Sequence, residues 1–125
     1  MHEFATAQQI VRTITRVGLQ NGAKKITEVH LEIGDLTFLV PEQLKFSFDI
    51  ASKGTIAEGA NIRITHVNAK VFCPKCKYKG VLNLESSGDT LMMELSLSQC
   101  PKCGERDLEI IGGHELNIKN IRVET

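Results

Sequence analysis

The order of apolar and polar residues predicts two helices. Across residues 5–20, apolar side chains recur every three or four positions, the period of an amphipathic helix, and Thr6 is a candidate cap. Asn21-Gly22 then supplies a stop signal. Because proline suits the first helical turn, a second helix is expected to begin at Pro41 and to end near Gly54. The residues expected on the buried faces are Ile10, Val11, Ile14, Val17, Leu44, Phe48 and Ala51.

Alternation with a period of two predicts the strands. Residues 26–33 alternate apolar and polar side chains, as expected of a half-buried strand. A strand is also expected over residues 61–72, where a shift in the apolar register indicates a β-bulge near His66. Residues 90–98 alternate in the same way and predict one strand of a hairpin. A last strand is expected over residues 116–123.

Two identical tetrapeptides hold all the cysteines, Cys73-Pro74-Lys75-Cys76 and Cys100-Pro101-Lys102-Cys103. Two Cys-x-x-Cys knuckles can bring four sulfurs to one tetrahedral ion, and thiolates suit zinc. A closed shell of four thiolates leaves no coordination position for a substrate, so the predicted zinc site is structural. Its ligands are Cys73, Cys76, Cys100 and Cys103.

These elements predict an α+β fold. Two helices and a small mixed sheet, in the order αβαββ, are completed by the C-terminal strand, which needs a sheet and finds the nearest one in the strands before residue 73. Residues 1–72 with 108–125 are expected to form this domain, and residues 73–107 an inserted zinc ribbon. A chain of 125 residues suits one small domain plus a metal-clamped module too small to hold a core alone.

Composition excludes some classes of protein. Fifteen basic and fifteen acidic side chains cancel, so bulk charge argues weakly against a nucleic-acid partner. The start of the chain lacks the basic and apolar regions of a signal peptide, and no apolar run approaches the roughly 20 residues of a membrane span. We therefore expect a cytoplasmic protein without a membrane anchor, in which paired cysteines hold metal rather than form disulfides.

The first residues offer a second set of metal ligands. A free amine on Met1, together with the amide nitrogen and Nδ1 of His2, can close adjacent chelate rings around one ion. Amide and imidazole nitrogens favour square-planar Ni(II) or Cu(II) over zinc. Glu3 can add an amide nitrogen, a carboxylate or only electrostatic support. A histidine at position 2 is more often part of a frayed terminus, so the residues alone leave both interpretations open.

Several segments, together with the two knuckles, closely resemble the HypA/HybF family of hydrogenase maturation factors across essentially the whole chain. The segments are Met1-His2-Glu3, residues 22–26, Gly34-Asp35-Leu36, and residues 41–46, 54–60 and 116–122. The resemblance implies a small metallochaperone that carries Ni(II) to the [NiFe] hydrogenase large subunit, works with the GTPase HypB, and in some organisms also serves urease. It implies nickel at the amino terminus around His2, and zinc at the four cysteines.

We therefore predict a nickel-binding metallochaperone with nickel as cargo and zinc as a structural ion. We expect a monomer or weak dimer with no catalytic residues, because the chain shows no nucleophile with a base and no paired-carboxylate motif. The chain lacks a phosphate-binding loop, so any nucleotide-driven step must be supplied by a partner. As a weaker hypothesis, His66 or His114 completes or strains the nickel site.

Two other classes of protein are weighed against this prediction. Basic residues gather near the knuckles, as in a zinc ribbon that binds nucleic acid or another protein, but one tyrosine and no tryptophan leave little on which bases could stack. These residues are Lys70, Lys75, Lys77, Lys79, Lys102 and Arg106. A rubredoxin-like electron carrier would place iron at the same thiolates, and its red colour when oxidised would separate it from a colourless zinc protein.

Overall fold

The computed structural model describes residues 2–125, and the chain divides into two compact units. The first, here called the helical unit, comprises residues 2–32, Leu39–Thr65 and Asn117–Thr125. The second, the cysteine unit, comprises Ile33–Phe38 and His66–Leu116. The predicted boundaries at residues 73 and 107 therefore lie inside the cysteine unit, which also takes a short segment from before the second helix.

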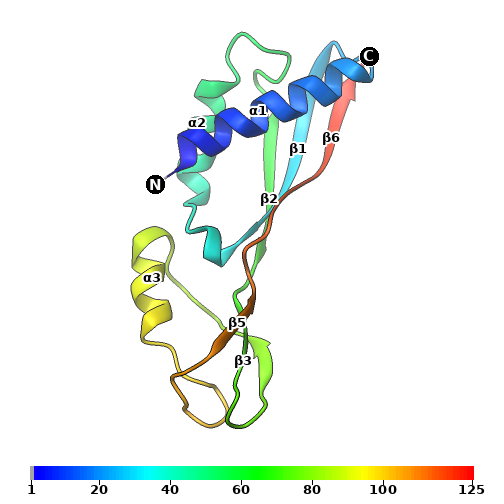
Figure 1. Cartoon of the computed structure of the whole chain (residues 1–125). Coiled ribbons are helices and arrows are strands. Elements are labelled where there is room, and N and C mark those ends of the chain that lie inside the picture. Colours follow the sequence, from blue (N-terminus) through cyan, green and yellow to red (C-terminus); the bar gives the residue numbers. More distant parts are fainter. Residues whose placement is uncertain (1) are drawn as a thin grey trace. The chain divides into compact units, whose positions relative to one another are not determined.

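The helical unit is built on a sheet of three strands in the order β2-β1-β6. The strands are β1 (Lys25–Gly34), β2 (Asn61–Val67) and β6 (Leu116–Glu124). The chain's last strand thus joins the strands that precede residue 73, as predicted. Figure 1 shows α1 (Glu3–Gln20) lying across this sheet, and α1 packs against α2 (Pro41–Ala51).

The core of the helical unit is formed by side chains that recur with the helix and strand periods. One face of each helix and alternate positions of β1 are buried, because side chains three or four apart share a helix face and side chains two apart share a strand face. On α1, β1 and α2 the fully buried side chains are Ala7, Ile14, Ile26, Val29, Leu31, Leu44 and Phe48. Pro41 begins α2 as predicted. Thr6, however, lies inside α1, whose N-cap is His2, so the proposed Thr6 cap is wrong.

The cysteine unit contains a second sheet, in the order β4-β3-β5. Its strands are β3 (Lys70–Phe72), β4 (Lys79–Val81) and β5 (Glu109–Gly112), and β3 pairs antiparallel with both neighbours. A helix, α3 (Gly88–Ser96), and the 3₁₀ turn η1 (Asp35–Thr37) complete the unit. The first knuckle follows β3 directly, so the sheet fixes where Cys73 lies.

The strand predicted over residues 90–98 is wrong, because this segment forms α3. Leu91 is buried, Leu95 and Ser98 are half-buried, and Met92 and Met93 are exposed. Buried positions separated by three or four residues are helical, and leucine, methionine and glutamate are strong helix formers. The apparent alternation arose because apolar side chains occupy both faces of this helix.

The long strand predicted over residues 61–72 is instead two strands, β2 and β3, which belong to different sheets. The chain leaves the strand conformation at Asn68 and Ala69. The shift in apolar register therefore marks a change of sheet rather than the bulge expected near His66. An irregularity does occur further on, where the pairing of β3 with β5 shifts between Lys70 and Val71. Among the described residues, none of the helices is long and apolar enough to cross a membrane.

Candidate metal centre and amino-terminal site

The four cysteine sulfurs converge on one point. The Sγ atoms of Cys73 and Cys103 are 3.6 Å apart, as are those of Cys76 and Cys100. All four atoms lie within 4.8 Å of one another. A tetrahedral zinc ion with Zn–S bonds of about 2.3 Å separates its sulfurs by about 3.8 Å. The spacing and the thiolate chemistry therefore fit zinc, which would hold both knuckles together when bound.

The two knuckles repeat the same backbone hydrogen bonds. The Lys77 N–H donates to the Cys73 carbonyl at 2.8 Å, and the Gly104 N–H donates to the Cys100 carbonyl at 2.9 Å. Both closing residues adopt a left-handed conformation, with φ of 67° at Lys77 and 80° at Gly104. Glycine takes this conformation without strain, whereas a lysine does so at a cost. The knuckles therefore match in shape but differ in local strain.

Backbone groups also orient the sulfurs. The N–H groups of Lys102 and Cys103 both point to the Cys100 sulfur at 3.4 Å. Cys73 and Cys100 are buried, Cys76 is half-buried and Cys103 is exposed. One side of the cluster is thus enclosed by protein and the other faces solvent.

The thiols of the metal-free cluster do not titrate alike. Burial opposes ionisation of Cys100, but the N–H groups of Cys103 and Lys102 and the neighbouring thiols outweigh it and lower its pKa to about 6. At Cys103 a backbone hydrogen bond favours the thiolate, but burial and the three other sulfurs raise the pKa to about 12. Burial is also the main cause that raises the pKa of Cys76. A divalent cation is needed before all four sulfurs can be thiolates at neutral pH.

His2 lies at the N-terminus of α1, as its N-cap, and is exposed. Its side chain makes no capping hydrogen bond. Hydrogen bonding within α1 begins with the Thr6 N–H, which donates to the His2 carbonyl at 2.9 Å. The first N–H groups of a helix have no acceptor within it. Met1, the other predicted nickel ligand with Glu3, lies outside the described residues.

Glu3 is buried, with 5% of its surface exposed. Its Oε2 accepts a hydrogen bond of 2.9 Å from the N–H of Val40, the N-cap of α2. Burial raises the pKa of the Glu3 carboxyl, but the hydrogen bonds that it accepts outweigh burial and hold the pKa below its usual value. This carboxylate therefore ties the start of α1 to the start of α2. Sequence reasoning did not find the contact, because the two residues are far apart in the chain.

The other histidines have identifiable partners or surroundings. His66 Nε2 lies 2.7 Å from Oδ1 of Asp35, whose side chain is 1% exposed. His66 also lines a cavity of about 480 Å³ in the cysteine unit. His30 Nε2 is 2.6 Å from the Thr65 hydroxyl. His114 is exposed. The prediction that His66 or His114 completes the nickel site stays a prediction.

Comparison with known families matches residues 1–123 to HypA, described as hydrogenase/urease nickel incorporation metallochaperones. The chain is 40% identical over 124 residues to hydrogenase maturation factor HypA of Methanothermobacter thermautotrophicus, covering 99% of this chain and 98% of that protein. It is 36% identical to the factor of the same name from Methanocaldococcus jannaschii, over 99% of this chain and 98% of that protein.

Solved structures show the same fold. The solution structure of the Ni metallochaperone HypA from Helicobacter pylori superposes with a TM-score of 0.61 and 18% identity, covering 98% of this chain and 97% of that chain. A second solution structure, titled as HypA protein, gives a TM-score of 0.64 at 18% identity, over 99% and 97% of the two chains.

The fold and the four-cysteine cluster define a small α+β protein with a candidate metal-binding site. The chain belongs to the HypA family of nickel metallochaperones, which serve hydrogenase maturation. Membership confirms the predicted family, the metallochaperone function and the absence of an enzymatic role. Family membership therefore favours a metallochaperone over the nucleic-acid-binding zinc ribbon and the electron carrier.

Proposed function

We propose that the protein carries Ni(II) at its amino terminus and keeps zinc at Cys73, Cys76, Cys100 and Cys103. The observation that carries the nickel site is the position of His2, which is exposed at the start of α1 beside a Glu3 whose carboxylate is fixed to Val40. His2 supplies an imidazole and an amide nitrogen, and Met1 supplies the amine. Glu3 supplies an amide nitrogen or the anchoring contact.

The same features explain how such a site would release its cargo. Imidazole must be neutral and amides must lose protons before they bind nickel, so mild acid weakens binding. An exposed ligand set also lets a partner displace one ligand at a time. The cysteine cluster, half enclosed and closed to further ligands, keeps its zinc during this exchange.

The proposed partners are the GTPase HypB and the [NiFe] hydrogenase large subunit, met in the cytoplasm. Any nucleotide-driven step must come from a partner, because the chain has no phosphate-binding loop, and a separate GTPase would supply it. The exposed side of α1 is our choice for the docking surface, since nickel passes between neighbouring sites. Charge reversal at Arg12 and Arg16 on this helix should weaken the complex, and an unchanged affinity for HypB would remove α1 from the interface.

Nickel titration tests the site directly. Untagged protein should bind one Ni(II), whereas His2→Ala should bind it at least about tenfold more weakly, because each lost ligand removes chelate energy. A few residues added before Met1 should weaken binding similarly by removing the terminal amine. His30→Ala is the matched control, since it removes a histidine bonded to Thr65 and should bind as wild type. Equal nickel affinity in all four proteins would contradict the proposal.

A further inference from the structure

The cysteine unit contains a cavity of about 480 Å³ that is separate from the four sulfurs. It lies at the start of β3, the end of β4 and the end of β5, and all the residues that line it belong to the cysteine unit. Its wall combines basic, acidic and apolar side chains. Those that matter for binding are His66, Val67, Asn68, Lys70, Val81 and Glu115.

Lys70 brings a positive charge to this cavity. It pairs with Val81 of β4 on one side and with Gly112 of β5 on the other, and residues directly opposite each other share a face of the sheet. Because Gly112 has no side chain, the Lys70 stem lies over it: a Cβ at Gly112 would be 3.3 Å from the Lys70 Cβ. Lys70 is exposed, and within residues 2–125 no carboxylate lies within 4.0 Å of its ammonium group. Its charge can therefore pair with a ligand.

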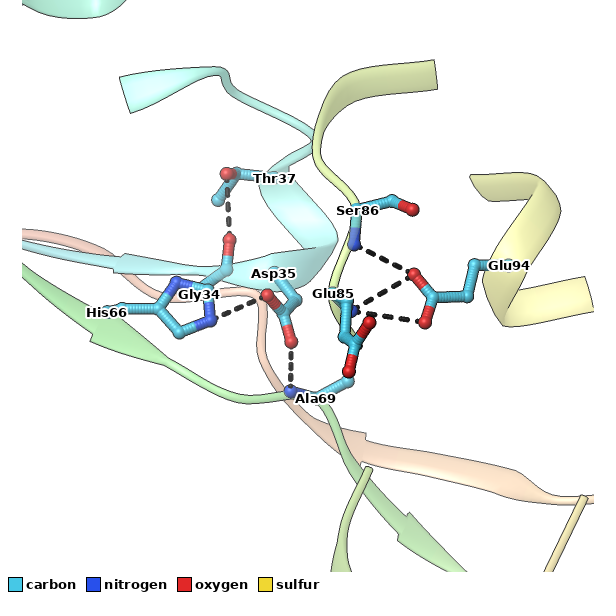
Figure 2. A network of polar contacts seen from close by, with 8 residues as sticks. All are labelled: Gly34, Asp35, Thr37, His66, Ala69, Glu85, Ser86 and Glu94. Atoms are coloured by element: carbon cyan, nitrogen blue, oxygen red, sulfur yellow. Dashed lines mark hydrogen bonds and ion pairs between the residues drawn. The ribbon is translucent and has the colours of Figure 1, made fainter. Parts of the chain in front are cut away.

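His66 is oriented by a buried carboxylate. Figure 2 shows its Nε2 directed at Oδ1 of Asp35, 2.7 Å away, while Oδ2 of Asp35 accepts the Ala69 N–H at 2.9 Å. The Asp35 side chain is 1% exposed, whereas the His66 side chain is 53% exposed. Since a carboxylate accepts hydrogen bonds, the Nε2 proton faces Asp35, and Nδ1 is the nitrogen left for a ligand. When the ring is protonated, Nδ1 can donate a charge-assisted hydrogen bond to an anion.

The charges around the cavity favour an anion over a cation. Glu115 is the acidic residue of the wall, and its Oε1 already accepts the Gly113 N–H at 2.8 Å. Residues 66–84 carry four lysines and no acidic residue, so an anion meets no repulsion from this segment. A cation would lack ligands, because among the described residues only the four cysteines bring three or more ligating groups of His, Cys, Asp or Glu together.

The wall also distinguishes between kinds of anion. Val67 and Val81 offer apolar surface that suits the methylene groups of an acidic side chain. Arginine forks and free backbone N–H groups favour phosphate, and aromatic rings stack on bases. Among the described residues that line the cavity there is no arginine, phenylalanine, tyrosine or tryptophan, and the Gly113 N–H is taken by Glu115. The cavity therefore suits a carboxylate side chain better than a phosphate or a nucleotide.

We propose that this cavity binds a carboxylate side chain from an acidic segment of a protein partner. Lys70 supplies the positive charge, His66 supplies a donor that Asp35 positions, and the two valines contact the stem of the bound side chain. The site lies wholly within the cysteine unit and does not depend on the nickel site proposed at His2. It gives the cysteine unit a role in recognition beyond the retention of zinc.

Titration of the zinc-loaded protein with a blocked tetraglutamate peptide tests the site. The NMR signals of the Asn68, Lys70 and Gly112 amides should shift with one shared dissociation constant, and a blocked tetraglutamine peptide should leave them unchanged. Lys70→Gln should weaken binding at least about fivefold, because it removes a charge-assisted contact but keeps the stem over Gly112.

Lys79→Gln is the matched control. Lys79 is also exposed, lies on the neighbouring strand β4 and does not line the cavity. Its removal takes the same charge from the same sheet, so peptide binding should weaken by less than about twofold, through screened long-range attraction alone. Equal losses in Lys70→Gln and Lys79→Gln would reduce the binding to diffuse attraction and overturn the proposed site.

Two further variants should act in opposite directions, and they carry the test if Lys70→Gln does not fold. Glu115→Gln removes a like charge from the wall and should strengthen peptide binding about twofold. His66→Gln keeps an amide donor for the buried Asp35 but loses the ring, and should weaken binding about threefold. Weaker binding in Glu115→Gln would contradict an anion site.

Other probes separate the carboxylate from its rivals. Tighter binding of inorganic phosphate or of a single-stranded oligonucleotide than of tetraglutamate, with the same dependence on Lys70, would replace the acidic protein by a phosphate ligand. His2→Ala should bind the peptide as wild type does. A failure of the nickel site and a failure of the carboxylate site are therefore observed separately.

Discussion

The helical unit and the cysteine unit are held together by different physical means. Most of the large, fully buried side chains of the described residues belong to the helical unit, and only Val71 and Cys73 belong to the cysteine unit. The first unit therefore rests on apolar burial. The second has a small core, short strands and four sulfurs positioned for one cation. A fold of this kind draws its stability from metal binding, as small domains do when their core is insufficient.

The difference in how the two units are stabilised matches the different roles proposed for the two metals. A cation that holds a unit together must stay bound, whereas a cargo must leave. The proposed nickel ligand His2 lies at an exposed helix start within the unit that has its own core, so release of a cargo from it would not require unfolding.

Loss of the metal should produce the largest difference in stability between the two units. Cys73→Ser removes a buried ligand and should abolish zinc retention, worth about 10 kcal/mol for structural zinc in small domains. Amide protection should be lost at Val71 in β3 but kept at Leu31 in β1. Zinc analysis and hydrogen exchange measure both. Met93→Ser, on the exposed side of α3, is the control. Full protection at Val71 in metal-free protein would show that the cysteine unit does not depend on zinc.

Acidification should remove the same cation in a graded way. The raised pKa values of Cys76 and of Cys103, about 12 for the latter, mean that both thiols hold protons in the metal-free cluster near neutrality. Zinc must displace at least two protons, so its affinity should fall about a hundredfold for each pH unit lost between pH 8 and 6. Chelator competition at three pH values gives the slope. A tenfold or flatter dependence would contradict the protonated cluster.

A core truncation should affect the helical unit without touching zinc. Phe48 is fully buried on α2, and Phe48→Ala should lower the free energy of unfolding by about 3–5 kcal/mol. Phe46→Ala is the control on the same helix, because Phe46 is 67% exposed, and should change the free energy by about 0.5 kcal/mol or less. Urea unfolding measures the free energy of unfolding of both variants, and zinc analysis measures their metal content. Zinc loss in Phe48→Ala would show that zinc binding by the cysteine unit depends on the core of the helical unit.

The close approach of the Gly34 backbone to Gly113 should tolerate no side chain at Gly34. Gly34 has a negative φ, so the cost of Gly34→Ala is steric: its methyl group would meet the Gly113 carbonyl, and about 1–3 kcal/mol of stability should be lost. Gly54→Ala is the contrasting control, with a φ of 79° and open space, and should cost about 1 kcal/mol through backbone strain alone. Denaturant midpoints measure both. A smaller loss in Gly34→Ala than in Gly54→Ala would contradict the close packing of Gly34 against Gly113.

The smallest effect is expected at the knuckles. Lys77→Gly relieves the left-handed strain and should stabilise the zinc-loaded protein by about 0.5–1 kcal/mol. The gain is reduced because the Lys77 ammonium lies 5.9 Å from the centre of the Phe72 ring, a weak cation–π contact. Gly104→Lys should lose a similar amount. Thermal unfolding of the loaded protein compares them, and a loss in Lys77→Gly would show that the side-chain contact outweighs the strain.

The same contrast explains what the sequence could predict. In the helical unit, the apolar period of residues 5–20 and the alternation of residues 26–33 identified α1 and β1, because burial against one core enforces those periods. In the cysteine unit, residues 90–98 were assigned to a strand, because Leu91, Met93, Leu95 and Leu97 satisfy a period of two. In the structure they belong largely to a helix, on which Leu91 is buried and Leu95 is half-buried. A small core enforces periodicity weakly.

Candidate site residues could be predicted from short local motifs, but not where the contacts depend on the fold. Cysteine spacing predicted a four-sulfur cluster, because the four ligands lie in two short local motifs. The chemistry of an amine, an amide and an imidazole pointed to His2. Asp35 and the Glu3 to Val40 contact left no local signal, since their partners are brought together only by the fold. The motif Gly34-Asp35-Leu36 was visible, but its role was not.

The segment Ile33–Phe38, which belongs to the cysteine unit, bears on whether this unit can be moved to another protein. The polypeptide passes from one unit to the other at residues 32–33, 38–39, 65–66 and 116–117, so four peptide connections join the two units. A proteolytic cut at one of these junctions would leave the other three in place. Transplanting residues 66–116 into another protein would leave behind the six-residue piece that completes them, and such a graft should need Ile33–Phe38 supplied alongside.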